Sequence, residues 1–365
     1  MKVGTLTFHR SNNYGAVLQA YALQTVLDQL GTTSQIIDYV RPVKEESVFF
    51  PWWGFKNCII NGFTLLHYTK AKLRYARFQE FRKNFFRISP KSYHSCEELE
   101  KAPPEGDAFI CGSDQIWRPV LDHNRLRVYY LDFISAKKVK KIAYAPSFGV
   151  SSVSGEFMQF IRPLINDIPY LSVREKTGQQ IISQAAEREA QIVLDPCLLL
   201  RPEDWSPIAL PPCVDPPYVL VYCQSQRRSF RDLVRHLKKL TRLPVVVISP
   251  TALNLIPDAD HVIFEAGPQE FVGLFANASC ICTNSFHATA FSLINRRPFW
   301  TTPIRLANSR LADLLNMIGL SNRQVNGAED FPDAPLEIDY SRAQEILDEA
   351  RRNSITFLKN ALNDE

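Results

Sequence analysis

A chain of 365 residues is long for one hydrophobic core and comfortable for two, and its 45% hydrophobic and 22% charged residues exclude a disordered or fibrous chain. The formal net charge of +4 is small, so it gives no argument for a nucleic-acid partner. No run reaches the roughly 18 apolar residues of a membrane span, and the start MKVGTLTFHR lacks the apolar stretch of a secretory signal. We therefore expect a cytoplasmic protein.

The first half of the chain alternates short β-branched runs with helical stretches, which is typical of parallel βαβ units. Residues 2–8 predict a strand, residues 16–31 a helix that ends at Gly31, and residues 34–40 the next strand. Further strands are predicted at 107–112, 141–146, 170–174 and 191–196.

Six prolines in residues 202–217 predict a linker, because proline sustains neither a helix interior nor a central strand. The alternation then restarts, with elements predicted at 218–223, 227–240, 243–249, 261–264, 268–276, 279–283 and 297–302. This order predicts an α/β fold of two Rossmann-like, doubly wound domains that face a cleft, residues 1–205 and 206–365. A C-terminal helix is predicted over 341–362, placed so that it can pack back on the first domain.

Residues 51–90 form a basic and aromatic excursion in the first domain. They hold eight Lys or Arg, one acid and ten aromatic residues, a local charge of +7. Two interpretations stay open. Such a segment suits an anionic membrane face, which would place the protein at the inner side of the membrane. Alternatively it is a solvated helical excursion whose Phe78, Phe81 and Phe85 pack on the first domain.

Ligands of open parallel sheets lie beyond the carboxyl ends of the strands, so the residues just after each strand are candidates for a site. The stretch Thr283 to Ser285 offers good N-caps for a helix that starts at about Phe286. Such a start directs backbone N–H groups and a positive dipole at an anion. His287 would lie in the first turn, where a bound phosphate or carboxylate would favour its charged form. The alternative is a neutral histidine satisfied in the domain interface.

Two other loops offer charged candidates. Arg174 follows a predicted strand and could hold a carboxylate or phosphate with a bidentate fork, but a surface ion pair is the interpretation that the sequence favours. Asp114 lies close to Trp117, as in sugar-binding loops where an aromatic face packs on a sugar ring. The alternative for Asp114 is a helix cap or turn former.

Four motifs of common enzyme classes are missing from the sequence: GxxxxGK[ST], GxGxxG after the first strand, HExxH and GxSxG. Their absence disfavours a P-loop kinase, a dinucleotide oxidoreductase, a zincin and an α/β-hydrolase. The eight cysteines include one close pair, Cys280 and Cys282, with no second pair to complete a zinc site.

Six blocks in chain order resemble the polysaccharide pyruvyl transferase family: TLTFHRSNNYGAVLQAYALQ, FICGSDQIW, AYAPSFG, SVREKTG, VLDPCLLL and TNSFHATAFSLINRRPF. The resemblance implies a fold like that of the two-domain GT-B glycosyltransferases. It also implies transfer of a pyruvyl group from phosphoenolpyruvate to two hydroxyls of one sugar, with formation of a ketal and release of phosphate. The family is associated with capsule, exopolysaccharide and cell-wall polymers, and its donor arginine and histidine match Arg174 and His287.

The resemblance to this family implies that phosphoenolpyruvate is a donor substrate, and no cofactor or metal is expected. The donor site comprises Arg174, Asn284, Ser285, Phe286 and His287. His287 is the candidate general acid, and Asp114 or Glu175 would accept the proton of the attacking hydroxyl. The acceptor, a sugar or a lipid-linked oligosaccharide, is expected on the first domain, at Asn12, Asn13, Tyr14, Ser113, Gln115 and Trp117.

Two rival functions remain. One is a glycosyltransferase of the same architecture that uses a nucleotide sugar, since a diphosphate also favours a helix start with a nearby arginine. The other is a non-catalytic, membrane-docked member of a polysaccharide assembly complex, in which residues 51–90 would be the working part.

Overall fold

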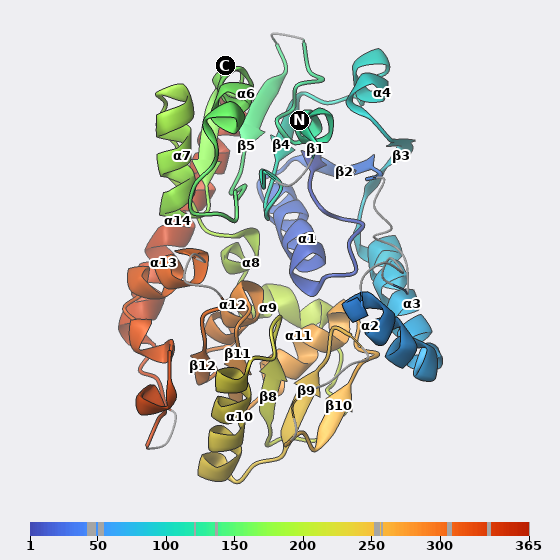
Figure 1. The fold of residues 1–365 in the computed structure, drawn as a ribbon. Coiled ribbons are helices and arrows are strands. Elements are labelled where there is room, and N and C mark those ends of the chain that lie inside the picture. Colours follow the sequence, from blue (N-terminus) through green and yellow to red (C-terminus); the bar gives the residue numbers. More distant parts are fainter. Residues whose placement is uncertain are drawn as a thin grey trace.

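Two parallel β-sheets, each flanked by helices, organise the protein (Figure 1). The structure is a computed structural model that describes residues 1–41, 49, 55–119, 122–135, 138–251, 256, 258–304, 309–333 and 337–364. The two sheets lie in the two halves of the molecule, and the last helix runs from the C-terminal half up along the N-terminal half.

The N-terminal sheet has seven strands in the order β3-β2-β1-β4-β5-β6-β7, all paired in parallel. Their bounds are β1 Lys2–Leu6, β2 Thr33–Tyr39, β3 Ile88–Tyr93, β4 Ala108–Cys111, β5 Lys140–Ala143, β6 Tyr170–Val173 and β7 Gln191–Ile192. The strand order reverses between β1 and β4, which makes the loops after these two strands the switch point of the sheet.

The C-terminal sheet repeats this winding with five parallel strands in the order β10-β9-β8-β11-β12. They are β8 Val219–Tyr222, β9 Val245–Ile248, β10 His261–Ile263, β11 Cys280–Thr283 and β12 Phe299–Thr301. The second switch point lies between β8 and β11.

The helices connect successive strands and cover the sheets (Figure 1). Those of the described residues are α1 Tyr14–Gln29, α2 Phe55–Leu66, α3 Tyr68–Phe85, α4 Cys96–Lys101, α5 His123–Tyr129, α6 Gly155–Asn166, α7 Lys176–Ala186, α8 Pro196–Leu199, α9 Pro202–Trp205, α10 Arg228–Thr241, α11 Pro268–Asn277, α12 Phe286–Ile294, α13 Ser309–Met317 and α14 Ser341–Asn363. Short 3₁₀ turns lie at Ser206–Ile208, Ser321–Arg323 and Ala328–Asp330. None of the helices in these described ranges is long and apolar enough to cross a membrane.

Most predicted strands and helices are confirmed within one or two residues, because buried parallel strands are continuous apolar runs. The strand predicted at 191–196 is shorter, and only its first two residues pair. The sequence prediction missed β3, whose Pro90 is tolerated because the strand lies at the sheet edge. The proline-rich linker begins with a helical turn that we did not predict, since Pro202 occupies the first helical position of α9.

The basic excursion forms α2 and α3, and its residues 51–54 lie outside the described part of the chain. Phe78 and Phe81 are fully buried and Phe85 is half-buried against the same core, so the prediction of a helical excursion packed through its phenylalanines is confirmed. The exposed side of α2 is considered with the further inference below.

One hydrophobic core is shared by the two sheets. It joins side chains of α1 and the N-terminal strands with side chains of β8, α11, α12 and α14. Tyr14 of α1 stacks on Phe271 of α11, with ring centroids 4.6 Å apart, and its hydroxyl donates to the carbonyl of Ala266 at 2.7 Å. Helix α14 also reaches the first sheet, where the Lys140 ammonium donates to the carbonyl of Leu362. The two halves are therefore joined by interlocked side chains.

Gly273 allows α11 to pack against the proline-rich segment. A Cβ atom at this position would lie 1.7 Å from the carbonyl oxygen of Leu210, which is backbone and cannot move aside cheaply. We expect Gly273→Ala to lower the free energy of unfolding by about 2 kcal/mol, even though alanine favours a helix. Urea denaturation measures this change. Gly155→Ala is the matched control because its Cβ would meet open space, and equal stabilities of the two variants would contradict the prediction.

Candidate active site

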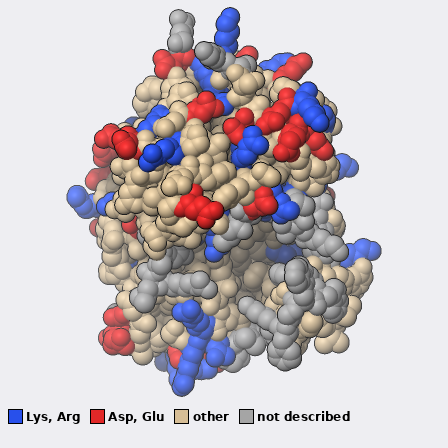
Figure 2. Space-filling view, turned by 45° about the horizontal axis from the view of Figure 1, so that its top comes forward, with Lys and Arg blue, Asp and Glu red and all other residues tan. Residues whose placement is uncertain are grey.

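A cavity of about 200 Å³ lies where the switch points of the two sheets face each other. It is lined by residues of the loops after β1, β4 and β8, together with the starts of α1, α12 and α13: Phe8, Ser11, Asn13, Ala16, Asp114, Gln115, Gln224, Phe286, His287 and Arg310. Figure 2 shows the molecular surface hollowed between the two halves, with Lys and Arg side chains inside the hollow. We call this cavity the cleft.

Asp195 joins Arg174 and His287, two of the residues that the sequence predicted for the donor site. One of its carboxylate oxygens forms an ion pair with Arg174 and lies 3.5 Å from Nε2 of His287. The hydroxyl oxygen of Ser113 lies 3.4 Å from this oxygen, and the backbone N–H of Cys197 donates to the other oxygen. Arg174 and His287, which are far apart in sequence, therefore share one carboxylate.

Asp195 is ionised despite complete burial. Burial opposes its ionisation, but His287, Arg174 and the Cys197 N–H outweigh burial and hold its pKa below the ordinary value. The sequence prediction did not name Asp195 as a site residue, although it lies in the block VLDPCLLL. The signal available was an Asp-Pro pair directly after a strand, where the aspartate caps α8.

The surface ion pair that the sequence favoured for Arg174 is wrong, because the side chain is only 2% exposed. Its guanidinium carbon lies 4.7 Å from the ring centroid of Phe286, and Nη2 lies 3.5 Å from Asp114. Its Nε atom is buried and makes no hydrogen bond within the described ranges. Arg174 thus has two carboxylate neighbours and a donor still to be satisfied.

His287 lies in the first turn of α12, as predicted, and packs against α1 of the other half. A Cβ atom on Gly15 would lie 2.1 Å from Nδ1 of His287, so the imidazole occupies space that only glycine leaves open. The other ring nitrogen faces Asp195. Gly15 therefore positions His287, a role that the block NNYG did not reveal.

The start of α12 keeps its backbone donors available. The side chain of the N-cap residue Ser285 makes no capping hydrogen bond. Asn284 instead fixes the loop after β8, since it accepts from the N–H of Gln224 at 2.8 Å and donates to the carbonyl of Ser225 at 2.7 Å. The helix start can therefore offer N–H groups to an anion in the cleft.

Two further carboxylates lie near Arg174. Asp114 has a left-handed backbone, with φ of 72°, and its side chain is 16% exposed at the cleft. Glu175 is buried, and it accepts from the hydroxyl of Ser147 at 2.8 Å. Burial raises the pKa of Glu175, although Arg174 and Arg310 act in the opposite direction. Glu175 therefore takes up a proton more readily than an ordinary glutamate.

The raised pKa of Glu175 gives a pH-dependent stability. A carboxyl group whose pKa is higher in the folded state stabilises that state at low pH, and this contribution is lost as pH rises through the raised value. Glu175→Gln stays neutral, so we expect the stability of the variant relative to the natural protein to increase as pH rises above the ordinary glutamate pKa of 4.5. Denaturant titrations at several pH values above this one measure the difference. A constant difference would contradict the prediction.

Three residues that the sequence predicted for the acceptor site are buried, so their assignment to that site is wrong. Trp117 is fully buried, where it stacks on Tyr130 at 4.7 Å and donates to the carbonyl of Tyr129, so it presents no face to a sugar. Tyr14 belongs to the shared core. Ser113 is also fully buried, and its hydroxyl donates to the carbonyl of Ala145 at 2.8 Å.

The remaining predicted acceptor residues lie at or beside the cleft. Asn13 caps α1 and lines the cleft, while Asn12 accepts from Arg82 of α3 at 3.0 Å. Gln115 lies against Arg310, and its carboxamide oxygen, when turned toward the guanidinium, accepts from Nη1 at 2.8 Å. The sequence prediction missed Arg310, which follows no recognisable motif.

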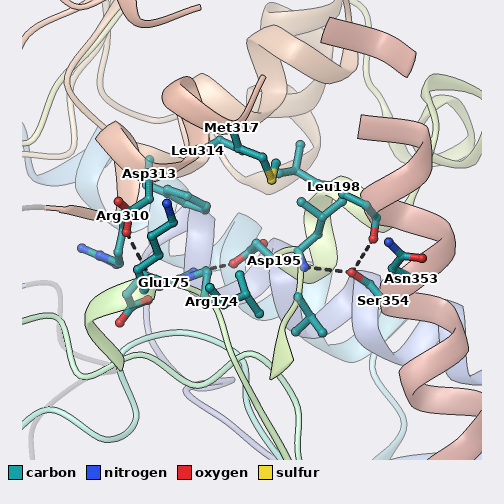
Figure 3. A pocket seen from close by; sticks show the side chains of 16 residues that line it. Arg174, Glu175, Asp195, Leu198, Arg310, Asp313, Leu314, Met317, Asn353 and Ser354 are labelled. Atoms are coloured by element: carbon teal, nitrogen blue, oxygen red, sulfur yellow. Dashed lines mark hydrogen bonds and ion pairs between the residues drawn. The ribbon is translucent and has the colours of Figure 1, made fainter. Parts of the chain in front are cut away.

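A second cavity of about 290 Å³ adjoins the cleft (Figure 3). Phe286 and Arg310 line both cavities, so they form the wall between them. Figure 3 shows Arg174 paired with Asp195 in this cavity, with Arg310 and Glu175 to one side and Ser354 to the other. Burial and the neighbouring Arg174 lower the pKa of Arg310 to about 10, so it stays charged near neutral pH. The site thus contains the buried Arg174 and the partly buried Arg310.

Asp195, Cys197 and His287 are the residues of the described chain that could hold a metal ion, since their ligand atoms lie within 4.8 Å of one another. Two features oppose this use. Arg174 already pairs with Asp195 and would repel a cation there. Burial also raises the pKa of the Cys197 thiol, whereas a metal would require the thiolate. The cluster fits an anion partner better than a cation.

Two facing parallel sheets with a cleft between their switch points define a GT-B-like α/β fold. One solved structure agrees with this architecture at low sequence identity. An α-glucosyltransferase in complex with UDP and DNA is 9% identical over 98% of this chain and 95% of its own, with a TM-score of 0.50. The UDP-GlcNAc 2-epimerase of Neisseria meningitidis is 9% identical over the whole of both chains, with a TM-score of 0.49.

The family follows from the sequence match. The family model of polysaccharide pyruvyl transferase matches residues 13–302, and the chain belongs to this family of transferases. The matched range includes Gly15, Asp114, Arg174, Asp195 and His287, and it ends before Arg310. No curated protein matches the chain significantly in sequence.

Proposed function

We propose that the protein transfers a pyruvyl group from phosphoenolpyruvate to a sugar of a surface polysaccharide or its precursor, such as a lipid-linked oligosaccharide. The observation that carries this proposal is the carboxylate of Asp195, which holds Arg174 and His287 together beside the open start of α12. Phosphoenolpyruvate has a carboxylate and a phosphate. Arg310, Arg174 and the helix N–H groups could bind these two anions.

His287 would act as the general acid. Its imidazolium protonates the methylene carbon of the donor, the double-bond electrons form the new C–H bond, and positive charge develops on the neighbouring carbon. Bound phosphate and the Asp195 carboxylate would both place negative charge beside this ring. Asp195 would thus orient and stabilise the charged ring without contacting the donor.

The acceptor then supplies two hydroxyl groups. The first attacks the cationic carbon and gives its proton to a carboxylate. We favour Asp114 for this role because it lines the same cavity as His287, whereas Glu175 lines the adjoining one. The second hydroxyl attacks the same carbon, the bond to phosphate breaks, and its proton recharges His287. The proton held by the carboxylate leaves with phosphate. All protons and bonds of the reaction are then accounted for without a cofactor or metal.

Donor binding provides the direct test. We expect calorimetry to show that phosphoenolpyruvate binds the purified protein, and that Arg310→Gln weakens binding at least tenfold because a partly buried cation that lines the cleft is lost. His287→Gln should retain binding but release no phosphate when a sugar acceptor is present. Arg352→Gln, an exposed arginine of α14, is the control. Thermal stabilisation by nucleotide diphosphates and none by phosphoenolpyruvate would overturn the proposal in favour of a glycosyltransferase.

A further inference from the structure

Exposed apolar side chains concentrate on α2 and the start of α3. Half of the twelve large apolar residues that stand out as exposed in the described chain fall between residues 59 and 73. They are 38% to 78% exposed: Ile59, Phe63, Leu65, Leu66, Tyr68 and Leu73. Ile59, Phe63 and Leu66 follow one another at i, i+4 and i+7, which is one face of a helix. We call these six residues the apolar face.

The lysine and arginine side chains near the apolar face point in different directions. Lys70 and Lys72 are exposed beside it, and Lys70 is partly paired with Glu265 at 3.4 Å. The arginines of α3 point inward instead. Arg77 donates to the carbonyl of Glu265 at 3.0 Å, and Arg74 donates to the carbonyl of Asn12 at 2.8 Å. The lysines are thus available to an external partner, while the arginines attach α3 to the rest of the protein.

These contacts connect the apolar face with the cleft. Arg74 and Arg82 of α3 both bind the loop after β1, through Asn12 and Ser11. The same loop contributes Ser11 and Asn13 to the lining of the cleft. In Figure 1, α2 and α3 lie along one side of the molecule next to α1, and α2 stands at the outer rim. A partner bound at the apolar face would therefore lie close to one edge of the cleft.

We propose that the apolar face, with Lys70 and Lys72, docks the protein on an anionic lipid bilayer. Leucine, isoleucine and phenylalanine beside lysine suit the boundary between acyl chains and anionic headgroups. A second copy of this chain is a poorer occupant, since a twofold interface would bring Lys70 and Lys72 against their counterparts. The surface shares no residue with the cleft lining, so failure of docking would leave the proposed reaction untouched.

Cosedimentation with vesicles tests the proposal on the full chain. We expect binding to vesicles of phosphatidylcholine with 30% phosphatidylglycerol, weak binding to phosphatidylcholine alone, and loss of binding at high salt. Phe63→Glu with Leu66→Glu should weaken binding at least tenfold. Lys70→Gln with Lys72→Gln should weaken it by a similar factor, since each lysine near an anionic surface is worth about fivefold. Val262→Glu is the matched control, an exposed apolar position on β10.

Three results would overturn the proposal. The natural protein would fail to bind anionic vesicles, or it would bind neutral and anionic vesicles equally, or the substitutions would change self-association in sedimentation velocity and leave vesicle binding intact. The first two results are obtained with the natural protein, so they do not depend on whether a variant folds. Phosphate release with a water-soluble acceptor should be unchanged in all the variants.

Discussion

Replacing Gly15 by alanine should reduce pyruvyl transfer at least a hundredfold while the protein stays folded. The new Cβ atom would lie 2.1 Å from Nδ1 of His287, so the imidazole would have to move away from its place beside Asp195. Displacement of a proton donor by about 1 Å can cost two orders of magnitude in rate. Alanine is the better helix former by about 1 kcal/mol, which offsets part of the strain. Phosphate release from phosphoenolpyruvate measures the effect.

Folding and donor binding are the controls for Gly15→Ala. Its circular dichroism spectrum should match that of the natural protein, and phosphoenolpyruvate binding should fall far less than turnover, because the cation Arg310 is untouched. Gly155→Ala, where a Cβ meets open space, should change neither rate nor binding. Full activity of Gly15→Ala would show that the position of His287 is unimportant for the reaction.

The substitution Asp195→Asn should reduce pyruvyl transfer as strongly as Gly15→Ala does. Its effect comes from the loss of a charge and not from a steric clash. It removes the carboxylate that Arg174 and His287 share, so the buried arginine loses the nearer of its two carboxylate partners and His287 loses its negatively charged neighbour. We expect turnover to fall by about 10²- to 10³-fold and the free energy of unfolding to fall by about 3 kcal/mol. Steady-state kinetics and urea denaturation near pH 7 measure the two effects.

The stability loss should also depend on pH in a definite direction. The pKa of Asp195 is lowered in the folded protein, so its contribution is present above the ordinary value and is lost as pH falls through the lowered one. The difference between Asp195→Asn and the natural protein should therefore shrink below about pH 4. Asp348→Asn is the matched control, since Asp348 pairs with the buried Arg351 and lines neither cavity of the site. If it slowed turnover equally, the loss would reflect stability alone.

The arrangement of strands could be predicted because each central strand is a short apolar run between polar loops. β8 and β9, for example, are fully buried along their length. β3 escaped prediction because its sequence is polar and contains Pro90. The start of α12 was predicted from three successive capping residues, and His287 lies in its first turn. Local patterns were sufficient wherever the structure is determined by neighbours in sequence.

The candidate site was predicted only in part, because its members meet through tertiary contacts. Asp195 is 21 residues from Arg174 and lies on a separate helix from His287, so no spacing connects them. The position of Trp117 was predicted wrongly, since the positive φ angles of Gly112 and Asp114 turn the loop after β4 and the indole is directed into the core. Spacing identifies which residues follow a strand, but the direction of each side chain depends on such turns.

The core that spans both sheets also bears on how substrates enter and leave. A hinge requires a boundary that water can enter at low cost, yet opening these halves would expose large side chains such as Tyr14 and Phe271, at about 1.5–3 kcal/mol each. Swinging of rigid lobes is therefore an expensive route. Exchange of donor and product should instead depend on small movements of the loops at the mouth of the cleft, and product release would then be controlled by those loops.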